Sequence, residues 1–231
     1  MKQNNIEYKV KKSSRAKRIS IRITNDGNTI VTLPQKVSKK HAHKFVEQKQ
    51  TWIKNTLKKI NKNRISYNFK QGEKFIFLDD YLYLNFIHKK LVYPRAEITS
   101  ENINIYRDEN RELPKNKIKE VIIKTFKKYF RNLVQEAVEE YNSIYQFKYN
   151  RIAIKNNKTN WGSCSSKKNL NFTWRLIFAP LDIIDYVVVH ELCHLKEQNH
   201  SKKFWKLVSK AIPDYKTRKK WLKENSSRLV F

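Results

Sequence analysis

Two histidines and a glutamate near the end of an apolar run have the types and spacing of a hydrolytic metal site. His190, Glu191 and His194 form the pattern His-Glu-x-x-His. The two histidines are one helical turn apart, so both imidazoles leave the same face of a helix and can hold one metal ion. A carboxylate at Glu191, not itself a ligand, can take a proton from water that the ion activates. The pattern predicts a catalytic zinc site.

A catalytic zinc takes a third protein ligand and keeps its fourth position open. The two downstream candidates are Glu197 and His200. Along a continuous helix Glu197 lies about 10 Å beyond His190, too far for a shared ion. His200 comes within reach if the helix ends at Asn199, a residue type that tolerates the left-handed conformation. We therefore prefer His200 and expect one Zn²⁺ per chain, held by His190, His194 and His200.

The elements that must position these residues are visible on both sides of the motif. Asp182 follows Pro180 as the expected N-cap of the metal-binding helix. Apolar residues then recur on most sides of that helix, which predicts that it is buried: Ile183, Ile184, Val187, Val188, Leu192 and Leu195. Ser201 is expected to cap a following helix from Lys202 to Ala211.

Composition narrows the class of protein. The chain has 231 residues and a formal net charge of +29. Its two cysteines, Cys164 and Cys193, lack CxxC spacing, so we expect reduced thiols in a cytoplasmic protein. No signal peptide and no apolar run of membrane-spanning length is visible. The positive charge attracts polyanions, and either nucleic-acid proximity or biased composition explains it.

The front of the chain reads as a small antiparallel sheet followed by a basic helix. Strands are expected at Ile6 to Val10, Arg18 to Thr24 and Thr29 to Leu33, with a hairpin turn at Asn25-Asp26-Gly27-Asn28. Ser38 is the expected N-cap of a helix running to about Ile60. One face of that helix is apolar and the other basic.

The rest of the chain alternates β-rich and helical stretches. Strands are predicted at Phe75 to Phe77, Tyr81 to Ile87, Lys90 to Tyr93 and Asn102 to Tyr106. Pro114 then opens a helix to about Tyr145, expected to pack against the metal-binding helix. Further strands are expected at Arg151 to Lys155 and Leu170 to Phe178, and Trp221-Leu222 begins a short tail.

These elements indicate an α+β fold with three regions. The first, 1–66, holds the small antiparallel sheet and the basic helix. The second, 67–110, is β-rich. The third, 111–231, is a zincin-like catalytic core built around the His-Glu-x-x-His helix.

The metzincin pattern is excluded by two residues. His190 and His200 have its spacing, but Glu197 replaces the expected glycine, and Met1, the only methionine, leaves no Met-turn.

Three motifs together resemble the YgjP-like metal-dependent hydrolases. These are Trp161-Gly162-Ser163-Cys164-Ser165, the run Ile184 to Leu195, and Asn199-His200-Ser201-Lys202-Lys203-Phe204-Trp205. The resemblance is strong from Arg151 to Trp221 and looser in the front half. It implies a zincin-type metallopeptidase related to the SprT-like and WLM groups, with His190, His194 and His200 as ligands and Glu191 as base. Cys193 stands where the family usually has a small residue such as alanine.

The leading hypothesis is a zinc-dependent peptidase that acts on peptide or protein substrates. An extended peptide is expected to add to the edge of the strand from Leu170 to Phe178. Trp161 and Ser163 are candidate cleft residues, although a tight turn at Gly162 explains that motif more simply. One alternative is a nucleic-acid-associated protein with a structural zinc, or a protease recruited to proteins on DNA or RNA. Another is hydrolysis of a non-peptide amide.

Overall fold

The computed structural model describes residues 2–3, 6–24, 27–63, 66–110, 112–157, 160–229 and 231. The chain is α+β, as predicted, and divides into two compact units. Unit 1 comprises Met1–Ile65 with Ser226–Val230, and unit 2 comprises Ser66–Asn225 with Phe231. The division into 1–66, 67–110 and 111–231 stays a prediction. Within the described residues, no helix combines the length and the apolar composition needed to cross a bilayer.

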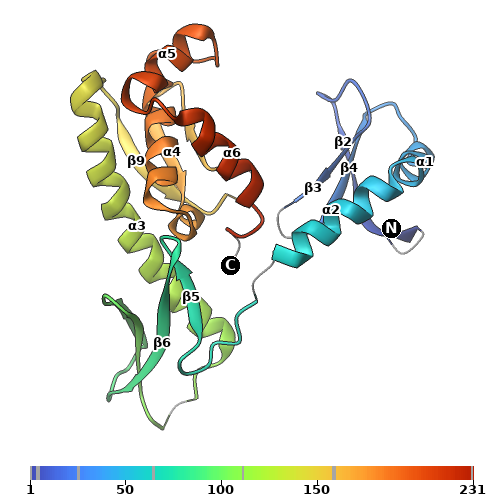
Figure 1. Ribbon diagram of the computed structural model, residues 1–231. Helices are drawn as coiled ribbons and strands as arrows, with labels where there is room; N and C mark the ends of the chain where they lie inside the picture. The colour runs from blue at the N-terminus through green and yellow to red at the C-terminus, as the bar shows by residue number, and fades with distance from the viewer. Residues whose placement is uncertain are drawn as a thin grey trace. The chain divides into compact units, whose positions relative to one another are not determined.

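Unit 1 contains a four-stranded sheet and two helices (Figure 1). The strands are β1 (Lys2–Gln3), β2 (Ile6–Ser13), β3 (Ser20–Ile23) and β4 (Thr29–Pro34), in the order β1-β2-β4-β3. The prediction of a purely antiparallel sheet was wrong, because β2 pairs with β4 in parallel. β3 and β4 form the expected antiparallel pair. Because β4 pairs with both strands, it lies between β2 and β3. Two residues of the predicted turn, Asn25 and Asp26, lie outside the described residues.

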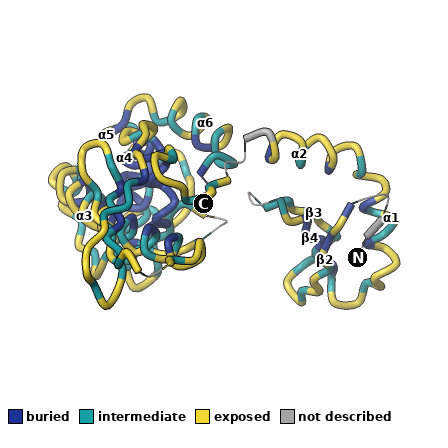
Figure 2. Tube along the Cα trace, turned by 90° about the horizontal axis from the view of Figure 1, so that it is seen from below, coloured by how far each residue is buried: buried dark blue, intermediate teal, exposed yellow. Residues whose placement is uncertain are grey.

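The basic helix of unit 1 is two helices rather than one. α1 (Lys40–Gln48) and α2 (Gln50–Asn63) are separated at Lys49, whose backbone leaves the helical region. Their apolar faces cover one side of the sheet, where Ala42, Val46 and Ile53 pack with strand residues in one core. The predicted N-cap at Ser38 was early by one residue, since Lys39 is the N-cap. Much of α2 is exposed (Figure 2).

Unit 2 begins with a sheet of the same topology. Its strands are β5 (Lys74–Phe77), β6 (Asp80–His88), β7 (Arg95–Ile98) and β8 (Asn102–Arg107), in the order β5-β6-β8-β7. As in unit 1, the central pair is parallel and the outer pairs are antiparallel. Three predicted strands are confirmed, but the strand at Lys90 to Tyr93 was wrong, because Tyr93 is 79% exposed and pairing begins after Pro94.

The helices of unit 2 supply a large part of its buried core (Figure 2). α3 (Lys115–Tyr145) begins after Pro114, as predicted, and packs against α4 (Leu181–Cys193). Fully buried aromatic side chains of α3, Phe126 and Phe130, belong to this core. Two shorter helices follow α4: α5 (Lys202–Ala211) and α6 (Tyr215–Asn225). The predicted tail from Trp221 was wrong at its start, because residues 221–225 belong to α6.

A three-stranded sheet lies beside α4. β9 (Arg151–Lys155), β10 (Gly162–Cys164) and β11 (Asn169–Thr173) are arranged in the order β10-β11-β9. The predicted strand from Leu170 to Phe178 ends early, because Trp174–Phe178 forms a buried 3-10 helix. Since β11 is paired on both sides, it offers no free edge to a peptide, and that prediction was wrong. β10 forms one edge of the described sheet and packs against α4.

Candidate metal centre

Helix α4 carries two of the four predicted site residues, His190 and Glu191, and its C-cap is a third, His194. It starts at Leu181 with Pro180 as the N-cap, so the predicted cap at Asp182 was wrong by two residues. Pro180 suits this position, because the missing N–H would have no helical partner there. Most of the helix is buried, which fixes His190 and Glu191 relative to the core.

The fourth residue, His200, comes from the turn between α4 and α5. We predicted that the helix would end at Asn199 in the left-handed conformation, but α4 ends at Cys193 and Asn199 has no positive φ. The chain turns immediately, with the N–H groups of Lys196 and Glu197 bonded to the carbonyl of Cys193. Ser201 is confirmed as the cap of α5, since its hydroxyl accepts from the N–H of Phe204 at 3.3 Å.

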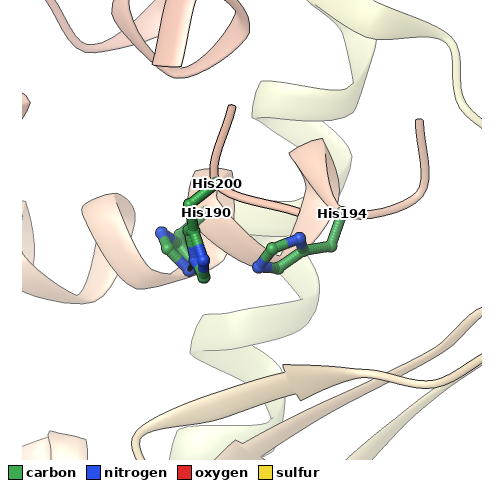
Figure 3. A group of neighbouring side chains, drawn as sticks. All are labelled: His190, His194 and His200. Carbon is green, nitrogen blue, oxygen red and sulfur yellow. Dashed lines mark hydrogen bonds between the residues drawn. The ribbon is translucent and has the colours of Figure 1, made fainter. Parts of the chain in front are cut away.

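The three predicted histidines gather at one point (Figure 3). Their candidate ligand nitrogens all lie within 4.8 Å of one another, and Nε2 of His190 is 3.0 Å from Nε2 of His200. Two nitrogens bound to one tetrahedral zinc at ~2.0–2.1 Å lie about 3.3 Å apart, so this spacing fits a shared ion. Nδ1 of His194 is 2.9 Å from the carbonyl of Glu197, the kind of outer hydrogen bond that orients a ligand ring. Among the described residues, the Glu197 carboxylate is not part of the cluster.

The surroundings favour the neutral form of the His190 and His200 imidazoles, which is the form that binds a metal. Burial, helped by the neighbouring His194, His200 and Lys219, lowers the pKa of His190 to about 3. The pKa of His200 is also lowered, by burial first and then by His194 and Lys219. A ring that resists protonation leaves its nitrogen lone pair free for a cation.

Glu191 is a buried carboxyl beside the histidine cluster, with only 4% of its surface exposed. Burial raises its pKa to about 8, against the opposing effect of a hydrogen bond from the backbone N–H of Cys164. Within the described part of the chain, Oε2 of Glu191 has no hydrogen-bond partner. A buried oxygen without a partner costs stability, so its presence indicates that a bound group supplies the missing hydrogen bond.

Gly162 makes room for that carboxyl. A Cβ atom at this position would lie 2.5 Å from Oε1, 2.6 Å from Cγ and 2.8 Å from Cδ of Glu191. The tight turn expected at Gly162 was wrong, since the residue lies within β10 and has no positive φ. Sequence reasoning missed this role, although a glycine inside a strand is the usual signal of a close approach.

The nitrogen donors, their spacing and the orphaned carboxylate oxygen together fit a divalent metal ion. Three imidazoles leave one tetrahedral position for water or substrate, and the buried carboxyl of Glu191 belongs to the residue directly after His190. These features define the class as a metal-dependent hydrolase site.

Comparison with known proteins places the chain in a family. The model described as "YgjP-like, metallopeptidase domain" matches residues 17–225, so the chain belongs to the YgjP-like metallopeptidases. One solved structure similar to it is the crystal structure of the metallopeptidase zymogen of Pyrococcus abyssi abylysin. That match has 21% identity and a TM-score of 0.36, and covers 39% of this chain and 93% of the other. The comparison with curated proteins gives no match.

Proposed function

We propose that this protein is a zinc-dependent peptidase in which His190, His194 and His200 hold the metal and Glu191 is the general base. The observation that carries the proposal is the convergence of three imidazoles, together with the buried carboxyl of the residue after His190. A zinc ion there would polarise the scissile carbonyl and lower the pKa of the attacking water.

The protein's own groups supply the proton transfers. Glu191, with a pKa of about 8, is poised near neutral pH, where a carboxyl can both accept and return a proton. It takes a proton from the attacking water and later delivers it to the leaving amine. Gly162 and the N–H of Cys164 fix the carboxyl from the β10 side.

The edge of β10 is the proposed binding place for an extended substrate. This strand, Gly162–Cys164, pairs with β11 on one side and lies next to Glu191. A peptide that adds to the other side through main-chain hydrogen bonds would bring its scissile bond towards the base. Trp161 and Ser163, predicted as cleft residues, flank or form this edge.

The test is hydrolysis of a peptide mixture of broad composition, followed by mass spectrometry. Glu191→Gln should keep the metal and lose cleavage by several orders of magnitude, while Glu197→Gln, a matched change outside the cluster, should leave both unchanged. If Glu191→Gln cleaves peptides like the wild type with metal bound, the proposal is wrong. Cleavage of simple amides but not of peptides would favour the non-peptide hydrolase alternative instead.

Charge on unit 1 supports a second function, binding of nucleic acid. Residues 1–65 hold 18 Lys and Arg against three Asp and Glu, a net of +15 (18 minus 3) within a total of +29. On α2, Lys54, Lys58 and Lys59 are exposed, and Trp52 is 48% exposed. These groups match a phosphate backbone and an unstacked base. A peptidase with such a unit would act on proteins bound to DNA or RNA.

Salt dependence tests this second function. Single-stranded RNA or DNA should bind more weakly as salt rises, and changing the three α2 lysines to glutamine should reduce the slope of log K against log salt by about 2–3. Replacing Lys206, Lys210 and Lys216 of unit 2 is the matched control. Binding that does not change with salt would contradict the nucleic-acid function.

We also propose a reducing, cytoplasmic location, which the two free cysteines support.

A further inference from the structure

His200 is the most exposed of the three proposed ligands. It is exposed and comes from a turn, whereas His190 and His194 are half-buried on or at the end of α4. His194 has an outer hydrogen bond to the carbonyl of Glu197. Within the described residues, the one hydrogen bond of the His200 ring is to His190, on the side that faces the proposed metal. Another contact must therefore hold this ring in place.

Trp205 supplies that contact. Its indole stacks on the His200 imidazole with ring centroids 5.6 Å apart and an interplanar angle of 26°. The first turn of α5 places Trp205 close to His200, because the backbone N–H of Trp205 bonds to the carbonyl of Ser201, the residue after His200. His200, the N-cap Ser201 and Trp205 therefore lie within about one helical turn of each other.

Helix α6 backs the indole. Tyr215 stacks on Trp205 with centroids 5.0 Å apart and an angle of 13°, and Nζ of Lys219 lies 4.3 Å from the indole centroid. A ring with several aromatic and cationic contacts has few alternative rotamers at low energy. The support of His200 thus extends through α5 to α6.

Phe204 does not have the same role. Its fully buried ring touches all three histidines, with centroids 4.9, 4.5 and 4.8 Å from His190, His194 and His200. It forms the floor of the whole cluster, so its loss would disturb every ligand together. Trp205 contacts His200 and His190, the latter at 5.9 Å, and no ring contact joins it to His194 among the described residues.

We infer that Trp205, backed by Tyr215, is a positioning residue that holds His200 in the orientation required to bind the metal. The inference rests on the proposed function, because it takes the three histidines to be ligands. It adds α5 and α6 to the metal centre, although neither helix contributes to the His-Glu-x-x-His motif.

Metal affinity is the first readout. Zn²⁺ dissociation constants are measured by competition with a chromophoric chelator for wild type, Trp205→Ala, Trp205→Phe and Trp221→Ala. Loss of an outer partner of a ligand typically weakens metal binding by 10–100-fold, and we expect this for Trp205→Ala. Trp205→Phe should stay within a few fold of wild type, because a phenyl ring can stack. Trp221, a half-buried tryptophan of α6, is the matched control and should bind as wild type.

The second readout needs no metal. In the metal-free protein, the ring-proton NMR signals of His200 should move on Trp205→Ala through loss of the indole ring current, while those of His194 stay in place. Circular dichroism verifies that each variant is folded. A folded Trp205→Ala that binds zinc with wild-type affinity would overturn the inference, whether or not the His200 signals move. If this variant does not fold, Tyr215→Ala decides: several-fold weaker binding supports the stack and unchanged binding refutes it.

The same zinc measurements distinguish a failure of the proposed function from a failure of the role of Trp205. If wild type binds no zinc, or if His200→Ala binds as wild type, the three-histidine site itself is wrong. If His200→Ala loses the metal and Trp205→Ala keeps it, the site stands and only the role of Trp205 falls.

Discussion

Substitution of Gly162 by alanine tests the close approach between β10 and the proposed base. The new Cβ would lie 2.5 Å from Oε1 of Glu191, whereas ordinary contact begins at 3.4 Å. The carboxyl must then move by about 0.9 Å (3.4 minus 2.5). Because Glu191 is 4% exposed, it has little free space to enter. Overpacking of this kind costs about 1–3 kcal/mol of stability.

A double-mutant cycle shows whether the cost arises from this contact. Glu191→Ala removes Cγ, Cδ and Oε1, so Gly162→Ala should cost almost nothing in that background. Glu191→Gln keeps the shape of the side chain, so there the cost should match that in the wild type. The expected coupling energy is therefore about 1–3 kcal/mol with Ala and near zero with Gln.

The assay is urea unfolding of the metal-free protein, followed by tryptophan emission. All variants carry Trp52→Phe, which removes the one tryptophan of unit 1 and leaves the signal to unit 2. Ser163→Ala, at the next position of β10, is the control and should show no coupling with Glu191. An equal cost of Gly162→Ala in the Glu191→Ala and wild-type backgrounds would refute the reasoning. With metal and substrate, the same displacement should lower kcat about 100-fold.

Three further outcomes are expected. In metal-free protein, Glu191 has a folded-state pKa of about 8 against an ordinary 4.5, so its contribution to stability is present below about pH 4.5 and is lost as pH rises through 8. Glu191→Gln should therefore have the same free energy of unfolding as wild type near pH 4, and its advantage over wild type should grow by about 1.4 kcal/mol per pH unit up to pH 8. Urea unfolding at several pH values measures this difference, and a difference that does not change with pH would contradict the expectation. Ser201→Ala removes the cap of α5 and should cost about 1 kcal/mol and weaken zinc binding, whereas Ser209→Ala, inside the same helix, should do neither. Chelation of the metal should abolish peptide cleavage, and added zinc should restore it; activity that survives chelation would exclude the proposed chemistry.

Much of the site was predictable because it depends on local periodicity. His190 and His194 share a helix face wherever the helix continues, and the apolar residues around them require burial. The structure also brings His200 to them, as expected. The predicted path to His200 was nevertheless wrong, because backbone hydrogen bonds to Cys193 close the turn without a left-handed residue.

Features that depend on tertiary contacts were missed. The order β10-β11-β9 makes β11 central, and nothing in the alternation of its residues distinguishes a central strand from an edge strand. Helix α6 was missed because the chain from Trp221 was interpreted as a tail, although Tyr215 and Leu222 have helical spacing. The support of His200 by Trp205 joins three segments, so spacing along the sequence does not reveal it.

Metal content per chain, measured by elemental analysis on untagged protein, tests the central claim most directly. Wild type should contain one zinc per chain after replenishment and dialysis, His200→Ala should lose it or hold it weakly, and Glu191→Gln should retain it. Wild-type protein without zinc after this treatment, or a His200→Ala variant with full occupancy, would contradict the three-histidine metal centre.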